Sequence, residues 1–281
     1  MMSESLGGLT QFVLPQPYRF GLPIIRRMRA AMEGKSLAAG MASLFEAIQV
    51  DLRVIGDTEC LRQHARGVLF VGDHRQAVEL VPFLAVLGQY GRESVRLVAK
   101  PFSMQARILA SLKVDLAAMI PVIPGTLARD RKRKLNRDLY WRLRARGRLP
   151  SAEEIRIINA LSLQACVSTV LDEGSVVLCP AGGVMDAVKR PWQQGVGKII
   201  KLLPPDAFNR TLIVPFRFDT FSRLQLLRAL HGMRIKPQQL TMRIGYQGTV
   251  GELLGDVATV ATMTARDVTD ILHQQFVGAF G

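Results

Sequence analysis

The chain has 281 residues, and 48% of them are hydrophobic, which is enough for one large α/β domain or two small domains with a substantial core. Its 37 Lys and Arg residues outnumber its 23 Asp and Glu residues, and the net charge of +14 indicates an anionic partner: nucleic acid, an anionic membrane surface or an acidic carrier protein. The three cysteines are scattered without metal-ligand spacing, which argues against a disulfide framework or a zinc site and indicates reduced thiols in a cytosolic protein.

Residues 1–50 form a predicted basic, amphipathic lead-in to an α/β domain over residues 51–281. The lead-in mixes arginines with apolar residues, a pattern typical of a segment that lies on a membrane surface. A basic helix packed on the domain, with its arginines in solvent, explains the pattern equally well. The least polar stretch, 37–50, is too short to span a bilayer, and the N-terminus lacks the features of a signal peptide. We therefore expect no transmembrane helix and only peripheral membrane contact.

Strands and helices alternate from residue 51 onward, which predicts an α/β fold with a mostly parallel central sheet flanked by helices and preceded by a helical lead-in. We expect strands at 67–71, 95–99, 119–123, 175–179, 211–216 and 240–245. We expect helices at 80–88, 103–112, 130–146, 152–172, 192–203, 222–231 and 265–278. Two of these helices begin with capping-box signatures, Ser151 with Glu154 and Thr264 with Asp267.

The turn after the first of these strands carries His74. The next helix is predicted to begin near Leu80, because Pro82 is tolerated only in a first helical turn. His74 then precedes the helix, and Glu79 can reach back toward its imidazole. Such an arrangement suits a general base that a carboxylate holds in one tautomer. Taken alone, the spacing also fits a polar helix start in which the helix dipole favours Glu79.

Further motifs follow His74-x4-Glu79 in a fixed order along the chain. They are Lys100 after the second strand, Pro180-Ala181-Gly182-Gly183 after a buried strand, the glycine-containing segment 192–200, and Pro215 in a later strand. The ordered series resembles the glycerolphosphate and lysophospholipid acyltransferase superfamily of the His-x4-Asp/Glu type, over about residues 40–278.

The resemblance implies that His74 is the general base and Glu79 its orienting carboxylate. Pro180 and Gly182 match the ends of the family's Pro-Glu-Gly motif, which helps to bind the acceptor, but Ala181 replaces the central glutamate. The Arg-terminated motif that the family carries near residues 118–125 is missing from this sequence. The nearest following arginine is Arg129, which becomes a candidate for substrate binding.

Two further groups are candidates for substrate binding. Backbone N–H groups at Gly182 and Gly183 can stabilise an oxyanion or hold a phosphate. Lys100 can meet an acceptor phosphate, although a lysine that ends a strand is more often a plain surface residue. We expect the side chains of His64, His231 and His273 to be solvated or hydrogen-bonded without a catalytic role.

The sequence therefore predicts an acyltransferase that moves a fatty acyl group from acyl-CoA or acyl-carrier protein to a hydroxyl or amine acceptor, with a lipid as the favoured acceptor. It needs no metal and no cofactor beyond the acyl donor, because a base-activated acceptor attacks the thioester directly. Two alternatives remain: a non-catalytic lipid- or acyl-chain-binding protein on the same fold, and a basic nucleic-acid-binding protein. No nucleic-acid-binding motif accompanies the charge, so we expect no specific nucleic-acid partner.

The segment 129–148 holds ten Lys and Arg residues and is interrupted by Tyr140 and Trp141. A charge run of this kind is usually a solvated helix face. Interfacial aromatic residues flanked by arginines also suit the headgroup layer of an anionic membrane or an acidic carrier protein. We therefore expect a cytoplasmic protein that is peripheral on the inner face of a membrane, with a role in phospholipid metabolism.

Overall fold

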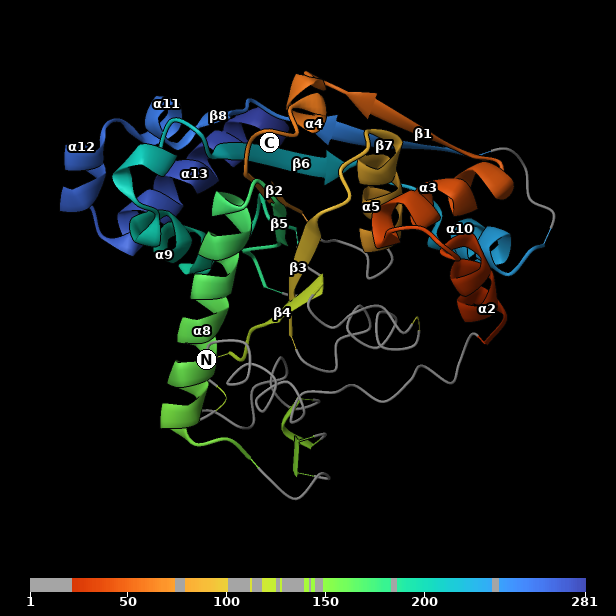
Figure 1. The fold of residues 1–281 in the computed structure, drawn as a ribbon, viewed down its shortest axis with the longest axis horizontal. Helices are drawn as coiled ribbons and strands as arrows, with labels where there is room; N and C mark the ends of the chain where they lie inside the picture. Colours follow the sequence, from red (N-terminus) through yellow and green to blue (C-terminus); the bar gives the residue numbers. More distant parts are fainter. Residues whose placement is uncertain are drawn as a thin grey trace.

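The computed structural model describes residues 22–73, 79–100, 112, 118–124, 127, 139–141, 143–144, 149–182, 186–233 and 238–281, and the account below concerns these residues. It has the predicted α/β fold, in which helices cover both faces of a mostly parallel sheet (Figure 1). The predicted helices at 103–112 and 130–146 lie mostly outside the described residues.

The sheet has eight strands in the order β1-β7-β6-β2-β5-β3-β4, with β8 paired to β6. Their bounds are β1 (Val50–Ile55), β2 (Val68–Gly72), β3 (Val95–Ala99), β4 (Met119–Pro121), β5 (Ser175–Leu178), β6 (Leu212–Phe218), β7 (Gln238–Ile244) and β8 (Gly248–Thr249). The five strands from β6 to β4 are parallel, whereas β7 runs antiparallel to β6 and parallel to β1. The carboxyl ends of β6, β2, β5 and β3 therefore share one edge of the sheet.

The helices follow the predicted alternation and add several that were not predicted. They are α2 (Leu22–Ala31), α3 (Leu37–Ala47), α4 (Glu59–Arg62), α5 (Leu80–Gln89), α8 (Ala152–Leu171), α9 (Gly195–Leu202), α10 (Arg223–Leu230), α11 (Val250–Leu254), α12 (Val257–Thr262) and α13 (Ala265–Phe280), with a 3₁₀ turn at Pro205–Ala207. The structure contains both predicted capping boxes, Ser151 with Glu154 before α8 and Thr264 with Asp267 before α13.

The central strand β2 divides the core into two layers, because successive side chains of a strand point to opposite faces. Val68 and Phe70 join a hydrophobic cluster built with α2, α3, α5 and α10. Leu69 and Val71 join the cluster on the other face, built with α8, α9, α11, α12 and α13. The helices that follow β2 and β5 thus cover opposite faces of the sheet: α5 covers the first and α9 the second.

The described part of the predicted lead-in, α2 and α3, shares this core. Ile25 and Met28 of α2 are 4% and 2% exposed and belong to the same hydrophobic cluster as Val68 and Phe70 of β2. Arg27 donates a hydrogen bond to the carbonyl of Ala229 in α10, 3.0 Å away, while Arg26 is exposed. Of the two interpretations of the lead-in, the described residues match the basic helix packed on the domain.

Only one helix in the described part of the chain, α8, is long and apolar enough to cross a membrane, judged by its length and composition. This is weak evidence, since core helices pass the same test. Polar side chains of α8 bond to the segment at the end of β4: Asn159 bonds both the amide and the carbonyl of Ile123, and the Ser162 hydroxyl donates to the carbonyl of Pro121. These contacts fix α8 against the edge of the sheet.

Candidate active site

The candidate site lies at the carboxyl ends of two adjacent strands, β2 and β5. The strands are parallel neighbours, with Val71 opposite Leu178, and the chain leaves them toward opposite faces of the sheet, into α5 and α9. In open α/β sheets, ligands bind in the crevice formed where connections diverge in this way. The sequence candidates come to this edge from three strands: Glu79 after β2, Pro180 and Gly182 after β5, and Lys100 after β3.

The strand β2 ends in a buried carboxylate. Asp73 is 2% exposed, and its backbone amide donates to the carbonyl of Phe216 on β6. The predicted general base, His74, follows Asp73 directly but lies outside the described residues, as do Gly183 and Arg129. The structure therefore fixes the residue that precedes the candidate base and leaves the role of His74 a prediction.

Glu79 stands immediately before α5, which begins at Leu80 as predicted. Glu79 is only 4% exposed, whereas a carboxylate at a solvated helix start is in contact with water. A buried carboxylate needs charged or hydrogen-bonding neighbours, because burial otherwise disfavours its charged form. The burial of Glu79 thus favours a site carboxylate over the alternative of a polar helix start.

Aromatic stacking holds the N-terminal turn of α5 against the strands. The rings of Phe83 on α5 and Phe216 on β6 stack with centroids 4.2 Å apart, and Phe70 on β2 meets Phe83 edge to face at 5.3 Å. Gly72 leaves room for this cluster, because a β-carbon at that position would lie 2.1 Å from the Phe216 ring. The glycine that ends β2 is therefore required by packing.

The Pro180–Gly182 segment forms a tight turn after β5. Gly182 has φ +72°, in the left-handed region that favours glycine, and its amide donates to the carbonyl of Cys179 over 3.0 Å. The carbonyl of Pro180 accepts from the amide of Gln193 at 2.8 Å, just before α9. Ala181 is 8% exposed and contributes a methyl group where the acyltransferase motif has a glutamate.

The thiol of Cys179, the residue that follows β5, is affected by the charges of two carboxylates of the site. Burial raises the pKa of its thiol to about 12, and the carboxylates of Glu79 and Asp73 act in the same direction. Both carboxylates therefore act on the end of β5. A thiol with this pKa stays protonated at neutral pH, so Cys179 lacks the thiolate that a nucleophilic cysteine needs.

Lys100 follows the last residue of β3 and is half-buried. Burial lowers the pKa of its ammonium group, because a low-dielectric environment disfavours the charged form. The structure therefore places Lys100 at the same edge of the sheet as Glu79 and Gly182, in partial contact with solvent. The role of Lys100 in substrate binding stays a prediction.

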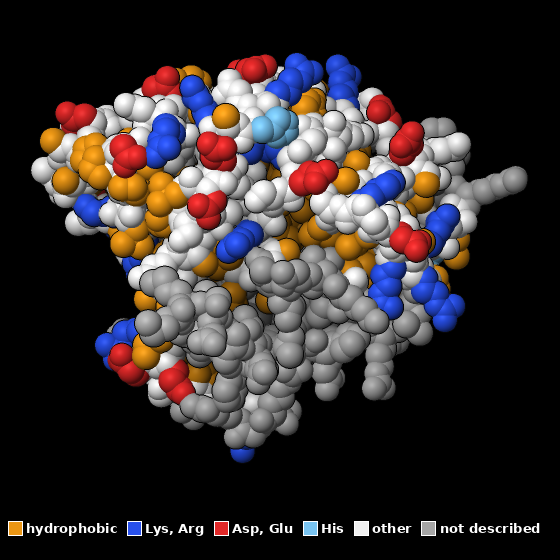
Figure 2. Space-filling model, viewed as in Figure 1, with side chains coloured by type: hydrophobic (Ala, Val, Ile, Leu, Met, Phe, Trp, Pro, Cys, Tyr) orange, Lys and Arg blue, Asp and Glu red, His pale blue; other side chains and the backbone are white. Residues whose placement is uncertain are grey.

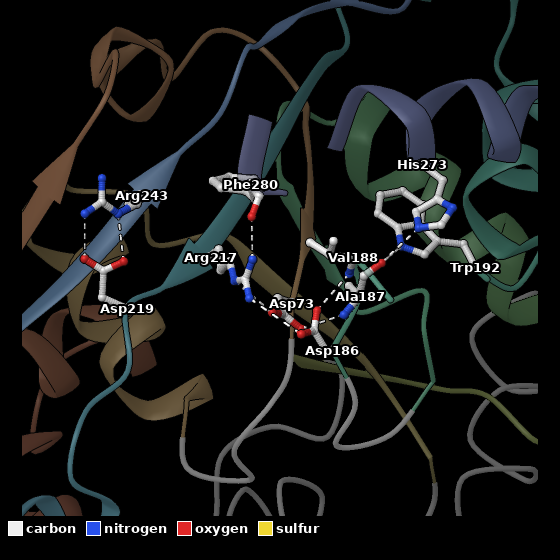
Figure 3. Close-up of polar contacts among 10 residues, drawn as sticks. All are labelled: Asp73, Asp186, Ala187, Val188, Trp192, Arg217, Asp219, Arg243, His273 and Phe280. Carbon is white, nitrogen blue, oxygen red and sulfur yellow. Dashed lines mark hydrogen bonds and ion pairs between the residues drawn. The ribbon is translucent and has the colours of Figure 1, made fainter. Parts of the chain in front are cut away.

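The sequence analysis missed an ionic network beside Asp73 (Figure 3). Arg217 on β6 lies 3.2 Å from Asp73 and 3.7 Å from Asp186, and it donates to the carbonyl of Phe280 on α13 at 2.7 Å. The second oxygen of Asp73 accepts from the amide of Ala187 at 2.9 Å. The one available signal was a charged residue inside the apolar strand Leu212–Phe218, since nothing in the sequence pairs Arg217 with Asp73.

The remaining histidines have the environments expected for them. His64 and His231 are exposed. His273 on α13 bonds the carbonyl of Ala187 through Nε2 at 2.9 Å, and the Trp192 indole donates to the same carbonyl at 3.1 Å (Figure 3). His273 is therefore hydrogen-bonded and belongs to the support of the 186–188 segment.

The described residues bring together buried carboxylates, a glycine turn and a half-buried lysine at one strand edge. Among these residues, no group of three or more His, Cys, Asp or Glu side chains is arranged to hold a metal ion. Buried carboxylates and the backbone of a glycine turn suit proton transfer and anion binding. No protein-family model matches the chain, and no curated protein matches it.

Proposed function

We propose that the protein is an acyltransferase that moves a fatty acyl group from acyl-CoA or acyl-carrier protein to a hydroxyl or amine acceptor, with a lipid as the preferred acceptor. The observation that carries the proposal is the burial of Glu79, five residues after His74 in the sequence. Glu79 lies where the connections after β2 and β5 lead to opposite faces of the sheet. In this position a carboxylate can orient the imidazole of His74, which lies between Asp73 and Glu79 in the sequence.

In the proposed reaction, His74 takes a proton from the acceptor hydroxyl or amine as that group attacks the thioester carbonyl. The carbon–sulfur bond breaks, and the departing thiolate takes the proton back from the imidazolium, so no atom of the enzyme is consumed. Because the Gly182 amide already donates to the carbonyl of Cys179, the backbone amide of Gly183 is the candidate to stabilise the oxyanion. The high pKa of the Cys179 thiol argues against a covalent cysteine route at this edge.

The proposal includes an anionic membrane surface and the acyl donor as partners. On the face seen in Figure 2, basic side chains are interspersed with acidic ones over the described surface rather than gathered in one patch. The basic run 129–148 lies mostly outside the described residues, but Trp141 within it is 55% exposed, with the Arg144 guanidinium 5.4 Å from its ring centroid. An exposed tryptophan beside an arginine suits a headgroup layer.

Two linked measurements test the function. Mass spectrometry of lipids from cells with and without the protein would reveal an acylated product that depends on it. The purified protein would then be offered acyl-CoA or acyl-carrier protein with that product's deacylated form, and release of the free thiol would be followed. An acceptor-dependent release supports the proposal. Tight binding of acyl chains with no release would instead identify a lipid-binding protein.

A further inference from the structure

The ionic network beside the candidate site joins four separate parts of the chain. Arg217 comes from β6, Asp73 from the end of β2, Asp186 from the segment after the Pro180–Gly182 turn, and the Phe280 carbonyl from α13 (Figure 3). The side chain of Asp73 is 1% exposed and that of Arg217 is 17% exposed. The charges are thus paired in a largely water-excluded place.

A buried ion pair of this kind contributes little net stability. Removing two charges from water costs free energy that their attraction only partly returns, and apolar residues of similar size often stabilise a core better. What the pair provides is fixed geometry, because a guanidinium presents its N–H groups in a rigid plane. Arg217 uses three of its nitrogens in three directions, toward Asp73, Asp186 and the carbonyl of Phe280.

The network also forms hydrogen bonds with the backbone next to the site. Asp73 precedes His74 directly, and its Oδ1 accepts from the amide of Ala187. Asp186 accepts from the amide of Val188 at 3.0 Å, while the carbonyl of Ala187 accepts from Trp192. The chain after the Pro180–Gly182 turn is therefore tied to the residue before His74 through Asp73 and Arg217.

From these contacts we infer that Arg217 is a positioning residue: it holds Asp73, the residue that precedes His74, and the chain after the glycine turn in one arrangement. The reaction that this serves rests on the proposed function, whereas the positioning itself does not. Arg217 touches neither substrate nor reacting atoms in this account. Its effect passes through Asp73 and the 186–188 segment.

The sheet supplies a matched control. Arg243 on β7 lies directly opposite Arg217 in the antiparallel register, and it pairs with Asp219 through two contacts of 2.7 and 2.9 Å. That pair is exposed on both sides and stands apart from Asp73 (Figure 3). Arg243→Met thus removes an arginine ion pair from the same region of the sheet without touching the network.

The test uses NMR of the full chain, which reports on position whether or not the protein turns over a substrate. Arg217→Met should raise hydrogen exchange at the Ala187 amide about tenfold, because its acceptor Asp73 loses its anchor. The same change removes the Arg217 charge from beside Asp73, which precedes His74, so the midpoint of the His74 imidazole titration should move to higher pH. Asp73→Asn should move that midpoint to lower pH, and Arg243→Met should change neither signal.

If the function is established, Arg217→Met should also lower kcat about tenfold with little change in KM, and Arg217→Lys should recover part of the loss. Asp186→Asn removes only the outer contact from a more exposed position, so it provides the same test if Arg217→Met does not fold. Unchanged Ala187 exchange and an unchanged His74 titration in Arg217→Met, or in Asp186→Asn if that variant is needed, would overturn the inference. If the wild-type protein shows no acyl transfer, but Arg217→Met still changes the Ala187 exchange rate and the His74 titration, the proposed function is refuted and the positioning role is kept.

Discussion

Phe83 stacks on Phe216 with ring centroids 4.2 Å apart, and this contact joins the helix that follows Glu79 to the strand that carries Arg217. The position of Glu79 therefore depends on the packing of an aromatic cluster as well as on the start of a helix. The small residue that makes room for the cluster is Gly72, at the end of β2.

Gly72→Ala should destabilise the protein by about 1–3 kcal/mol, because the added methyl group overlaps the Phe216 ring in a buried stack. Thermal or denaturant unfolding measures the change. The matched control is Gly278→Ala in α13, where an added β-carbon meets nothing within 4 Å. That substitution should stabilise the protein by about 0.5–1 kcal/mol, because alanine is the better helix former. Equal effects of the two substitutions would contradict the packing role of Gly72.

The three cysteine thiols should be unreactive toward thiol reagents in the native protein at neutral pH. Burial raises the pKa of each of the thiols of Cys60, Cys166 and Cys179 from 9.0 to about 12. We expect none of them to react with a soluble thiol reagent at pH 8, and all three to react after denaturation. Rapid labelling of Cys179 in the folded protein would show that its surroundings are more open than described.

Because of the same thiols, the free energy of unfolding should depend on pH in the alkaline range. An unfolded thiol loses its proton from about pH 9, whereas the folded protein holds it until about pH 12. The unfolded state therefore binds fewer protons in this window, and the free energy of unfolding should fall as pH rises through it. Because lysines and tyrosines titrate in the same range, the measurement compares the wild type with Cys179→Ala, which should lose stability less steeply.

Binding to membranes should depend on the basic run. Charge reversal at Arg131, Lys132, Arg133 and Lys134 should weaken binding to anionic vesicles, and binding of the wild type should weaken as salt rises because exposed charges are screened. A variant with the same total charge but reversals at Arg62, Arg66, Lys198 and Arg223, all exposed, separates a local surface from net charge. Equal binding to neutral and anionic vesicles would count against this partner.

The acceptor should differ from glycerol 3-phosphate and its monoacyl form. Ala181 offers a buried methyl group where the resembling family carries a glutamate that contacts the acceptor. A site that lacks a hydrogen-bonding partner loses its preference for the group that partner would recognise. A panel of hydroxyl and amine acceptors, assayed with both donors, measures the preference. Efficient acylation of glycerol 3-phosphate or lysophosphatidic acid would refute it.

Much of the fold was predictable because its elements carry local signals. Helix α5 begins where Pro82 requires, and α8 and α13 begin at their capping boxes. The strand β1 was missed although Val50–Ile55 alternates apolar and polar residues, since it was assigned to the boundary between the lead-in and the domain. The helical lead-in was predicted without the bounds of α3, because the apolar residues of α3 are set by packing against α5 rather than by a strong amphipathic period.

The site was predictable only where residues follow strands in sequence. Glu79, Lys100 and Gly182 became candidates because each lies just after a strand or just before a helix. Arg217 and Asp186 did not become candidates, because both lie over a hundred residues from Asp73 along the chain and no local pattern joins them to it. Long-range ionic contacts of this kind depend on strand order, which the sequence does not encode locally.

The most direct test of the central claim is the rate of acceptor-dependent thiol release from acyl-CoA or acyl-carrier protein by purified His74→Ala. The account predicts that transfer is abolished while the variant unfolds like the wild type, that Glu79→Gln loses less, and that His64→Ala, which removes an exposed histidine, retains the wild-type rate. Full activity of a correctly folded His74→Ala protein would contradict the assignment of His74 as the general base.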